Sequence, residues 1–250
     1  MIELTRTDNL LTIRLAHGKA SALDIELMDA LALAIAEANE SDAEAVILTG
    51  TGSIFSAGVD LYRLTEGGRE YCERFVPALS RFVLDFFTFP KPLVVAVNGH
   101  AIAGGCIMTL CGDYRLMAAG NGRIGMPELL VGVPFPAAIL EIVRFCVPPN
   151  HLQSLVYTGR TVQPEDALRL GFVDEVVAPD ALLARAEEQA RHLASLNPKI
   201  FQQTKRELRD QTISRAKHYT NEFDDEVRAL WSDPATHAHI REYLARTVRK

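Results

Sequence analysis

The stretch from Ala96 to Arg115 constrains the fold of this chain more than any other. The apolar run Leu93 to Val97, which leads into it, is typical of a fully buried strand. After a turn, the pair Gly104-Gly105 opens a helical stretch that ends near Asp113. Paired glycines at a helix start let a ligand approach the backbone closely and leave N–H groups unpaired. This turn is therefore a candidate place to hold an anion or a developing oxyanion.

The rest of the chain alternates strands with helices and then becomes helical. The sequence predicts strands at 2–6, 10–15, 45–49, 93–97, 114–119 and 172–177. It predicts helices at 25–40, 60–65, 70–87, 137–145, 148–157 and 164–170, and then at 180–195, 198–211, 214–231 and 234–247. With 250 residues, 48% of them hydrophobic, the chain can form one large core. We therefore expect an α/β core over 1–195 and a helical region over 196–250.

Charge and hydropathy exclude several classes of partner. The formal net charge is −6, which favours neither nucleic acid nor an anionic membrane surface. The N-terminus lacks a basic segment followed by an apolar run, as a signal peptide would have. No apolar stretch approaches the roughly 18 residues that span a bilayer. We expect a soluble, cytoplasmic protein.

Cysteine and histidine do not predict a metal site. The four cysteines lack the spacing of a zinc site, and we interpret them as reduced, partly buried thiols. The seven histidines are scattered, and His237 and His239 alternate around a predicted helix instead of facing one way. The tail residues Arg206, Arg209 and Lys217 are interpreted as a solvated helical face.

Two glycine loops follow predicted buried strands and could work together. The loop from Phe55 to Asp60 consists of small residues before a helix start, so it can leave the Val59 N–H exposed to a ligand. The second loop contains Gly104. Two such N–H donors could converge on one oxygen, as in an oxyanion hole. The alternative is that both loops are ordinary connections with close helix packing.

A third loop holds one carboxylate in apolar surroundings. Glu128 follows Met126-Pro127 and precedes two leucines. If partly buried, its carboxyl would have a raised pKa and could act as a general base near neutral pH. The alternative is a solvated glutamate at a helix N-terminus. Candidates for a second acid or base are Asp60, His100 and Asp113. Each also has a structural explanation: Asp60 caps a helix, His100 packs in the strand turn and Asp113 ends a helix.

Taken in order, these loops resemble the crotonase superfamily, the enoyl-CoA hydratase/isomerase family. The residues that carry the resemblance lie in 19–23, 55–60, 97–106, 111–114 and 126–128, with further matches at 158–160, 167–177 and 197–198. The resemblance implies an α/β spiral of ββα units with a C-terminal helical region that builds a homotrimer or a dimer of trimers. It implies an acyl-CoA thioester substrate and no separate cofactor, since coenzyme A is part of the substrate.

The resemblance also assigns the site residues. It implies that the N–H groups of Val59 and Gly104 form the oxyanion hole, and that Glu128 is catalytic. It further implies that the coenzyme A portion is bound by Lys19, Ala20, Ala22, Ala57, Asp60 and Leu61.

One departure from the family pattern narrows the chemistry. Enoyl-CoA hydratases of this family carry two catalytic glutamates, but here Ile107 stands at the first position and only Glu128 remains. The stretch after Glu128, Val133 to Ala137, is bulky and apolar where hydratases have a glycine-rich turn, which favours a drier pocket.

One base and an oxyanion hole suffice for a 1,3-proton shift. The stretch Ala103 to Cys106 with the aliphatic Ile107 next, the stretch Gly112 to Arg115 and the single Glu128 resemble the mitochondrial-type Δ3,Δ2-enoyl-CoA isomerases. By this resemblance, Glu128 would remove a C2 proton and return it at C4. The alternatives are another crotonase-type enzyme (a hydratase, hydrolase or lyase) and a non-catalytic acyl-CoA-binding protein.

Overall fold

Two β-sheets of different size form the framework of the chain in the computed structural model, which describes residues 1–247. The larger sheet has the order β1 (Ile2–Thr7), β2 (Leu10–Leu15), β3 (Ala45–Thr49), β5 (Leu93–Val97), β7 (Tyr114–Ala118) and β10 (Glu175–Val177). Its first pair is antiparallel and every later pair is parallel. The smaller sheet has the order β4 (Ile54–Ser56), β6 (His100–Ile102), β8 (Ile124–Gly125) and β9 (Thr161–Val162).

One connection pattern is used three times and positions the site. A strand of the larger sheet is followed by a strand of the smaller sheet and then by a helix, which gives the units β3-β4-α2, β5-β6-α3 and β7-β8-α4. The helices are α2 (Leu61–Thr88), α3 (Gly104–Leu110) and α4 (Glu128–Val131). Since β4, β6 and β8 are parallel neighbours, their carboxyl ends and the three following helix starts lie at one edge of the smaller sheet.

Helices bury both faces of the larger sheet. On one face, α8 (Leu182–Ala194) packs on the side chains of residues such as Ile47 and Val94. On the other, Leu48 and Val95 belong to the main core together with α1 (Ile25–Glu40) and α2. Alternate residues of each central strand therefore point into two separate apolar layers, which explains the unbroken apolar runs of β3 and β5. The predicted α/β fold is confirmed.

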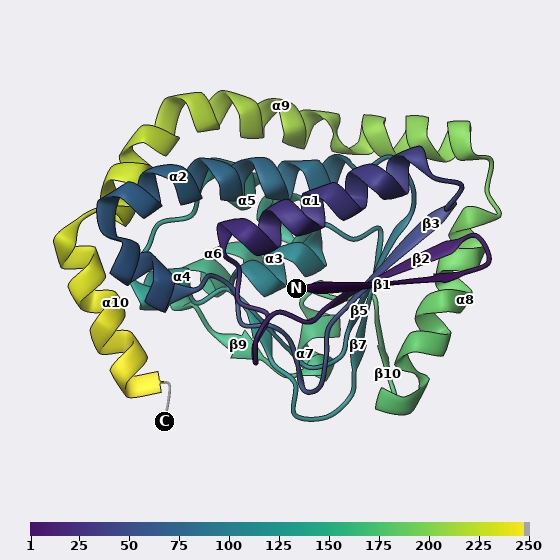
Figure 1. The fold of residues 1–250 in the computed structure, drawn as a ribbon, viewed down its shortest axis with the longest axis horizontal. Coiled ribbons are helices and arrows are strands. Elements are labelled where there is room, and N and C mark those ends of the chain that lie inside the picture. The colour runs from purple at the N-terminus through teal and green to yellow at the C-terminus, as the bar shows by residue number, and fades with distance from the viewer. Residues whose placement is uncertain (248–250) are drawn as a thin grey trace.

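The remaining helices follow α4 in the chain. They are α5 (Ala137–Cys146), α6 (Pro149–Thr158), α7 (Pro164–Arg169), the short 3₁₀ helix η1 (Pro179–Ala181), α9 (Pro198–Trp231) and α10 (Pro234–Thr247). The long helix α9 runs across the top of Figure 1 beside α2 and α5. After it the chain turns, and α10 descends next to α2 and α4.

Two predicted boundaries are wrong, and one predicted helix break is confirmed. The predicted helices 198–211 and 214–231 are one continuous helix, because their junction holds no glycine or proline and Thr212 is buried there. The two helices predicted at 60–65 and 70–87 are confirmed as two segments of α2, which breaks at Gly68, where φ is +60° and ψ is −151°. The predicted strand 172–177 is shortened to β10, because the Phe172 N–H donates to the Ala167 carbonyl at the end of α7 instead of joining the ladder.

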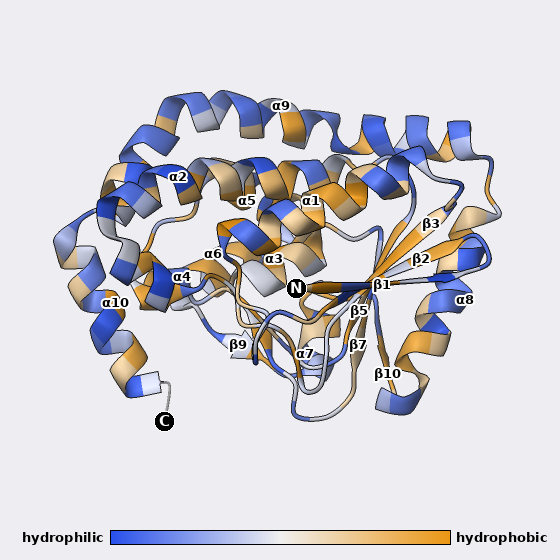
Figure 2. Ribbon diagram, viewed as in Figure 1, coloured by the Kyte–Doolittle hydropathy of each residue, from blue (hydrophilic) through white to orange (hydrophobic). Residues whose placement is uncertain are grey.

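The outer surface of α9 is hydrophilic, but two of its basic residues are buried. Figure 2 shows α9 as mostly blue toward solvent, with orange residues at intervals. Lys205 donates to a carboxylate oxygen of Asp113 at 2.6 Å, and Arg209 donates to the other at 2.9 Å. Both side chains are buried. The interpretation of Arg209 as part of a solvated face is therefore wrong, because Asp113 offers it a buried counter-charge.

No helix among residues 1–247 combines the length and the hydropathy that a bilayer crossing requires.

Candidate active site

A narrow pocket lies where the three helix starts meet. Its free space is about 70 Å³. It is lined by residues of six helices, of strand β6 and of the loops between elements: Ala57, Val59, Leu61, Leu79, Ile102, Ala103, Gly104, Pro127, Glu128, Val131, Val133, Phe135, Pro136, Ile139, Trp231 and Tyr243. The lining is mostly apolar, as the bulky sequence after Glu128 predicts. The structure therefore brings Val59, Gly104 and Glu128 into one cavity.

The two loop N–H groups in this pocket have no protein acceptor. The loop around Val59 is fixed on both sides, since Leu23 donates to the Gly58 carbonyl at 2.7 Å and Asp60 donates to the Leu23 carbonyl at 2.9 Å. Gly104 is the first residue of α3, a position whose N–H has no partner within the helix. Within residues 1–247, neither the Val59 N–H nor the Gly104 N–H donates to another protein group. Both are free to bind an oxygen atom in the pocket.

Backbone conformation brings the two loops close together. Gly58 has φ +82°, and a Cβ there would lie 2.6 Å from the Ile102 carbonyl oxygen and 3.0 Å from the Gly104 nitrogen. Ala103, just before Gly104, has φ +50° and ψ −118°, a region that a residue with a side chain rarely adopts. Such strain persists where the surrounding structure over-determines it, and it concentrates at functional sites.

Glu128 is the only carboxylate that lines the pocket. It begins α4 after Pro127, and only 8% of it is exposed. Its Oε2 atom is buried and has no hydrogen-bond partner within the described chain. Burial raises the pKa of the Glu128 carboxyl from 4.5 to about 8. The alternative of a solvated helix-start glutamate is excluded, because the side chain is buried.

Sequence reasoning missed several pocket residues, among them Tyr243 and Trp231. Tyr243 lies on α10 and is the only other ionisable side chain in the lining. Burial raises the pKa of its phenol, and the charge of Glu128 adds to the rise. The helix is held over α4 by His239, one turn earlier, whose Nε2 lies 3.2 Å from the Leu130 carbonyl oxygen. Nothing local marks Tyr243, because its place depends on the turn between α9 and α10.

The predicted coenzyme A-binding residues fall into two groups. Ala57 and Leu61 line the pocket. Ala20 lies beside this loop, since its carbonyl accepts from the Ala57 N–H at 2.9 Å. Lys19 is exposed and Ala22 is half-buried in the same segment, outside the pocket lining.

Asp60 is occupied as the N-cap of α2. It lies outside the pocket lining, and its carboxylate accepts from the Arg63 N–H at 3.0 Å. The predicted cap is thus confirmed.

The other candidates for a second acid or base do not line the pocket. Asp113 is paired with Lys205 and Arg209, and His100 lies in β6. Ile107 is fully buried inside α3, in the main core. None of these four residues, Asp60, His100, Asp113 and Ile107, contributes to the pocket lining.

Within residues 1–247, no three histidine, cysteine, aspartate or glutamate side chains gather as a metal site would require. His237 is instead buried, with Nε2 2.8 Å from the Trp231 carbonyl oxygen.

Comparisons with known proteins agree on one family. A family model described as enoyl-CoA hydratase/isomerase matches residues 5–247. A carnitinyl-CoA dehydratase from Salmonella arizonae is 32% identical over 224 residues, covering 87% of this chain and 85% of that protein. Two structures of one Mycobacterium tuberculosis protein, described as an enoyl-CoA isomerase in one and as a probable enoyl-CoA hydratase in the other, are 32% identical to this chain. The first has a TM-score of 0.83 and covers 91% of this chain and 97% of that one.

The human mitochondrial Δ3-Δ2-enoyl-CoA isomerase is also similar in structure. Its TM-score is 0.93, and the match covers 98% of this chain and 97% of that one. At 22% identity this likeness shows a common fold alone. It confirms the fold class that the sequence resemblance implied.

Proposed function

The chain belongs to the enoyl-CoA hydratase/isomerase family of the crotonase superfamily, and we propose that within it this enzyme is a Δ3,Δ2-enoyl-CoA isomerase with Glu128 as its only base. Such an enzyme moves a double bond from C3–C4 to C2–C3 of an acyl-CoA thioester. The reaction needs one group that removes a proton from C2 and returns it at C4, and a site that stabilises the enolate between the two steps.

The free N–H groups of Val59 and Gly104 suit the thioester oxygen. Removal of the C2 proton places negative charge on that oxygen, and two preorganised donors stabilise this charge in an apolar pocket more strongly than water does. Glu128 takes the proton as a carboxylate and holds it as a carboxylic acid. Because burial already favours the neutral acid, the protonated intermediate form costs little in this pocket.

One observation carries the proposal: the pocket holds a single carboxylate whose Oε2 is free. Hydration of a double bond requires a positioned water, a base for it and an acid for the α-carbon. The apolar lining around Glu128 offers no second carboxylate for that task. A proton shift within the substrate needs only the one that is present.

The test is a direct comparison of two reactions. Purified enzyme should convert 3-hexenoyl-CoA to 2-hexenoyl-CoA, measured by absorbance of the conjugated thioester, and should hydrate crotonyl-CoA poorly. Glu128→Gln should lower isomerisation by about 10²–10⁴-fold, the usual contribution of a general base. Isomerisation that survives this substitution would contradict the one-base mechanism, and efficient hydration would contradict the reaction itself.

A second candidate function is hydration or dehydration of an acyl-CoA. It is supported by the name of the Salmonella relative, a carnitinyl-CoA dehydratase, and by the Tyr243 hydroxyl in the pocket lining. Under this alternative the Tyr243 phenol takes part in proton transfer, so Tyr243→Phe should abolish crotonyl-CoA hydration. Isomerisation with Glu128 as the only base does not use this phenol for proton transfer. A hydrolase or lyase reaction, and a non-catalytic acyl-CoA-binding protein, remain further alternatives. Stabilisation by acyl-CoA without turnover of any enoyl-CoA would support the last of these.

Three further features belong to the proposal. The coenzyme A portion binds along Lys19, Ala20, Ala22, Ala57, Asp60 and Leu61, and the enzyme needs no separate cofactor. The C-terminal helical region, 196–250, forms a homotrimer or a dimer of trimers in the cytoplasm. The homo-oligomer is supported by exposed apolar side chains on α9, namely Ile200, Leu208, Phe223 and Leu230. Sedimentation velocity of the purified chain tests the assembly directly.

A further inference from the structure

The only tryptophan of the chain lies in the wall of the active-site pocket. Trp231 is the last residue of α9, and 2% of it is exposed. It lines the same cavity as Glu128, Val59 and Gly104. No step of the proton shift uses an indole, so the mechanism leaves this large side chain without a role.

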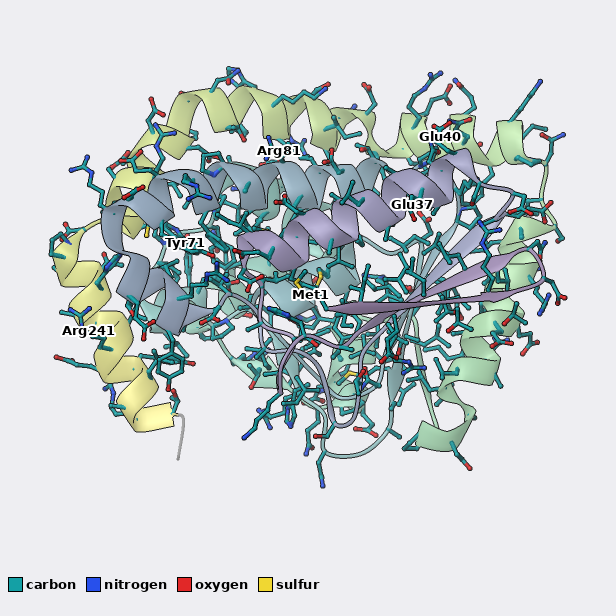
Figure 3. The ribbon with its side chains drawn as sticks, viewed as in Figure 1. Met1, Glu37, Glu40, Tyr71, Arg81 and Arg241 are labelled. Carbon is teal, nitrogen blue, oxygen red and sulfur yellow. The ribbon has the colours of Figure 1, made fainter. Side chains whose placement is uncertain are left out.

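Trp231 is held rigidly at both its ring and its backbone. Its indole Nε1 donates to the Pro134 carbonyl at 2.9 Å, which ties the end of α9 to the loop that follows Glu128. Its ring stacks on Phe75 with centroids 6.0 Å apart and planes inclined by 30°. Phe75 in turn stacks on Tyr71, which Figure 3 labels on α2. The indole therefore cannot swing aside without breaking a hydrogen bond and a stack.

The carbonyl of Trp231 fixes the backbone. It accepts from the Cys72 thiol at 3.3 Å and lies 2.8 Å from the His237 Nε2. The turn between α9 and α10 is thus attached to α2. As a result, the position of the indole is set by the consecutive helices α9 and α10 together with α2, which is far from both in the sequence.

The pocket divides into a polar part and an apolar part. The free N–H groups and Glu128 come from the starts of α2, α3 and α4. The apolar wall comes from the interior of α2, from α5 and its preceding loop, and from the end of α9, through Leu79, Phe135, Ile139 and Trp231. An acyl chain whose thioester lies at the polar part must extend along this apolar wall.

The space along that wall is small. A water-sized group occupies on the order of 10–15 Å³. The free space of about 70 Å³ therefore accommodates about five to seven such groups, each close in size to a methylene. A longer chain has to displace a side chain of the wall, and Trp231 is the largest of these.

We propose that Trp231 is a specificity-determining residue that closes the acyl part of the pocket and limits the substrate to acyl groups of about four to six carbons. This inference rests on the proposed binding of an acyl-CoA in this pocket, and it deepens that proposal by naming the class of acyl group. It does not depend on which reaction Glu128 catalyses.

Binding of saturated acyl-CoA thioesters tests the limit without requiring any turnover. Calorimetric titration of the full chain with butanoyl-, hexanoyl-, octanoyl- and decanoyl-CoA should show Kd falling by about fourfold per methylene up to six carbons, the gain expected from burying each one. Beyond that length Kd should rise by tenfold or more. Because saturated thioesters cannot isomerise, a failed isomerase assay would leave this result intact.

Variants assign the limit to the indole. The ratio of the Kd for octanoyl-CoA to the Kd for hexanoyl-CoA should be at least tenfold lower in Trp231→Leu than in the wild type. Trp231→Phe is the milder change and should shift the ratio in the same direction. Phe86→Leu is the matched control: Phe86 is buried in α2, packs on Phe82 and does not line the pocket, so this variant should be less stable with an unchanged chain-length profile.

Fluorescence gives a second readout, since all tryptophan emission comes from the pocket wall. Hexanoyl-CoA should change this emission, and free coenzyme A should not. The proposal is overturned if the wild type binds decanoyl-CoA as tightly as hexanoyl-CoA. It is also overturned if the dependence of Kd on chain length is unchanged in both Trp231 variants. Where neither variant folds, Leu79→Ala, which enlarges the pocket at the same wall, takes their place in this test.

Discussion

The backbones of Gly58 and Gly104 lie in direct contact: a Cβ on Gly104 would lie 3.6 Å from the Gly58 Cα, and a Cβ on Gly58 would lie 3.0 Å from the Gly104 nitrogen. This approach joins two loops that are separated by two strands and a long helix in the sequence. It brings the N–H groups of Val59 and Gly104 to one cavity. The spacing of those two donors, and with it enolate stabilisation, depends on the absence of a side chain at position 58.

Gly58→Ala should therefore reduce kcat more than a glycine-to-alanine change that introduces backbone strain alone. The added Cβ would lie 2.7 Å from the Ala103 Cβ and force the loops apart. Loss of one oxyanion donor typically costs about 10²–10³ in kcat. The matched control is Gly52→Ala, which has a similar φ of +64° but no neighbour within 4 Å of the new Cβ. Steady-state kinetics should show a large loss in the first variant only. Equal losses in both would contradict the two-donor arrangement.

The rate of isomerisation should rise with pH up to about pH 8. The base must be ionised to take a proton, and burial raises the pKa of Glu128 to about 8. Below that pH, kcat/KM should fall by about tenfold per unit, so the value at pH 6 should be about 100-fold below the plateau. The check is a pH profile of kcat/KM for a 3-enoyl-CoA. A profile that is flat between pH 5.5 and 8.5 would show that Glu128 ionises as it does in water.

Glu128→Gln should stabilise the fold, and more so at high pH. The folded pKa of about 8 lies above the ordinary value of 4.5, so between these values the folded chain binds a proton that the unfolded chain does not. Stability contributed by that proton is lost as the pH rises from 4.5 and is fully lost above pH 8. Glutamine does not titrate, so the difference in unfolding free energy between Glu128→Gln and the wild type should grow with pH to a few kcal/mol.

Urea unfolding at pH 5 and pH 9 measures this difference. The gap in unfolding free energy between Glu128→Gln and the wild type should be larger at pH 9. An equal gap at both pH values would mean that the carboxyl is not desolvated in the folded state.

Asp113→Asn should destabilise the chain strongly. Asp113 is the counter-charge of two buried cations, Lys205 and Arg209, and burial lowers the pKa of Lys205 to about 8. Removing one partner of a buried ion pair leaves uncompensated charge and costs about 3–5 kcal/mol. Asp166→Asn, which removes a partly exposed ion pair with Arg169, is the control and should cost less than about 1 kcal/mol. Similar losses for both variants in chemical denaturation would contradict the importance of burial.

The sequence was sufficient for much of the fold, and it named three residues that the structure brings into one pocket. Apolar runs such as Leu93 to Val97 predict strands that are buried on both faces, and the structure confirms them between two apolar layers. The glycine loops and the single glutamate are local features, so Val59, Gly104 and Glu128 could be named from residue types and spacing. The short strands β4, β6, β8 and β9 were not predicted, because two or three residues do not establish a periodicity.

What the sequence determined by itself is which chemical groups are available: one carboxylate after Pro127, isoleucine at position 107, and glycines where the backbone needs them. Only the tertiary structure decided what those groups become. Parallel pairing of β4, β6 and β8 gathers three helix starts at one edge, and the surrounding core removes Glu128 from water. The turn after α9 brings Trp231 and Tyr243 to the same cavity, and the α9 packing buries Arg209. Burial, and the pKa that follows from it, are properties of contacts between distant segments, so no local pattern encodes them.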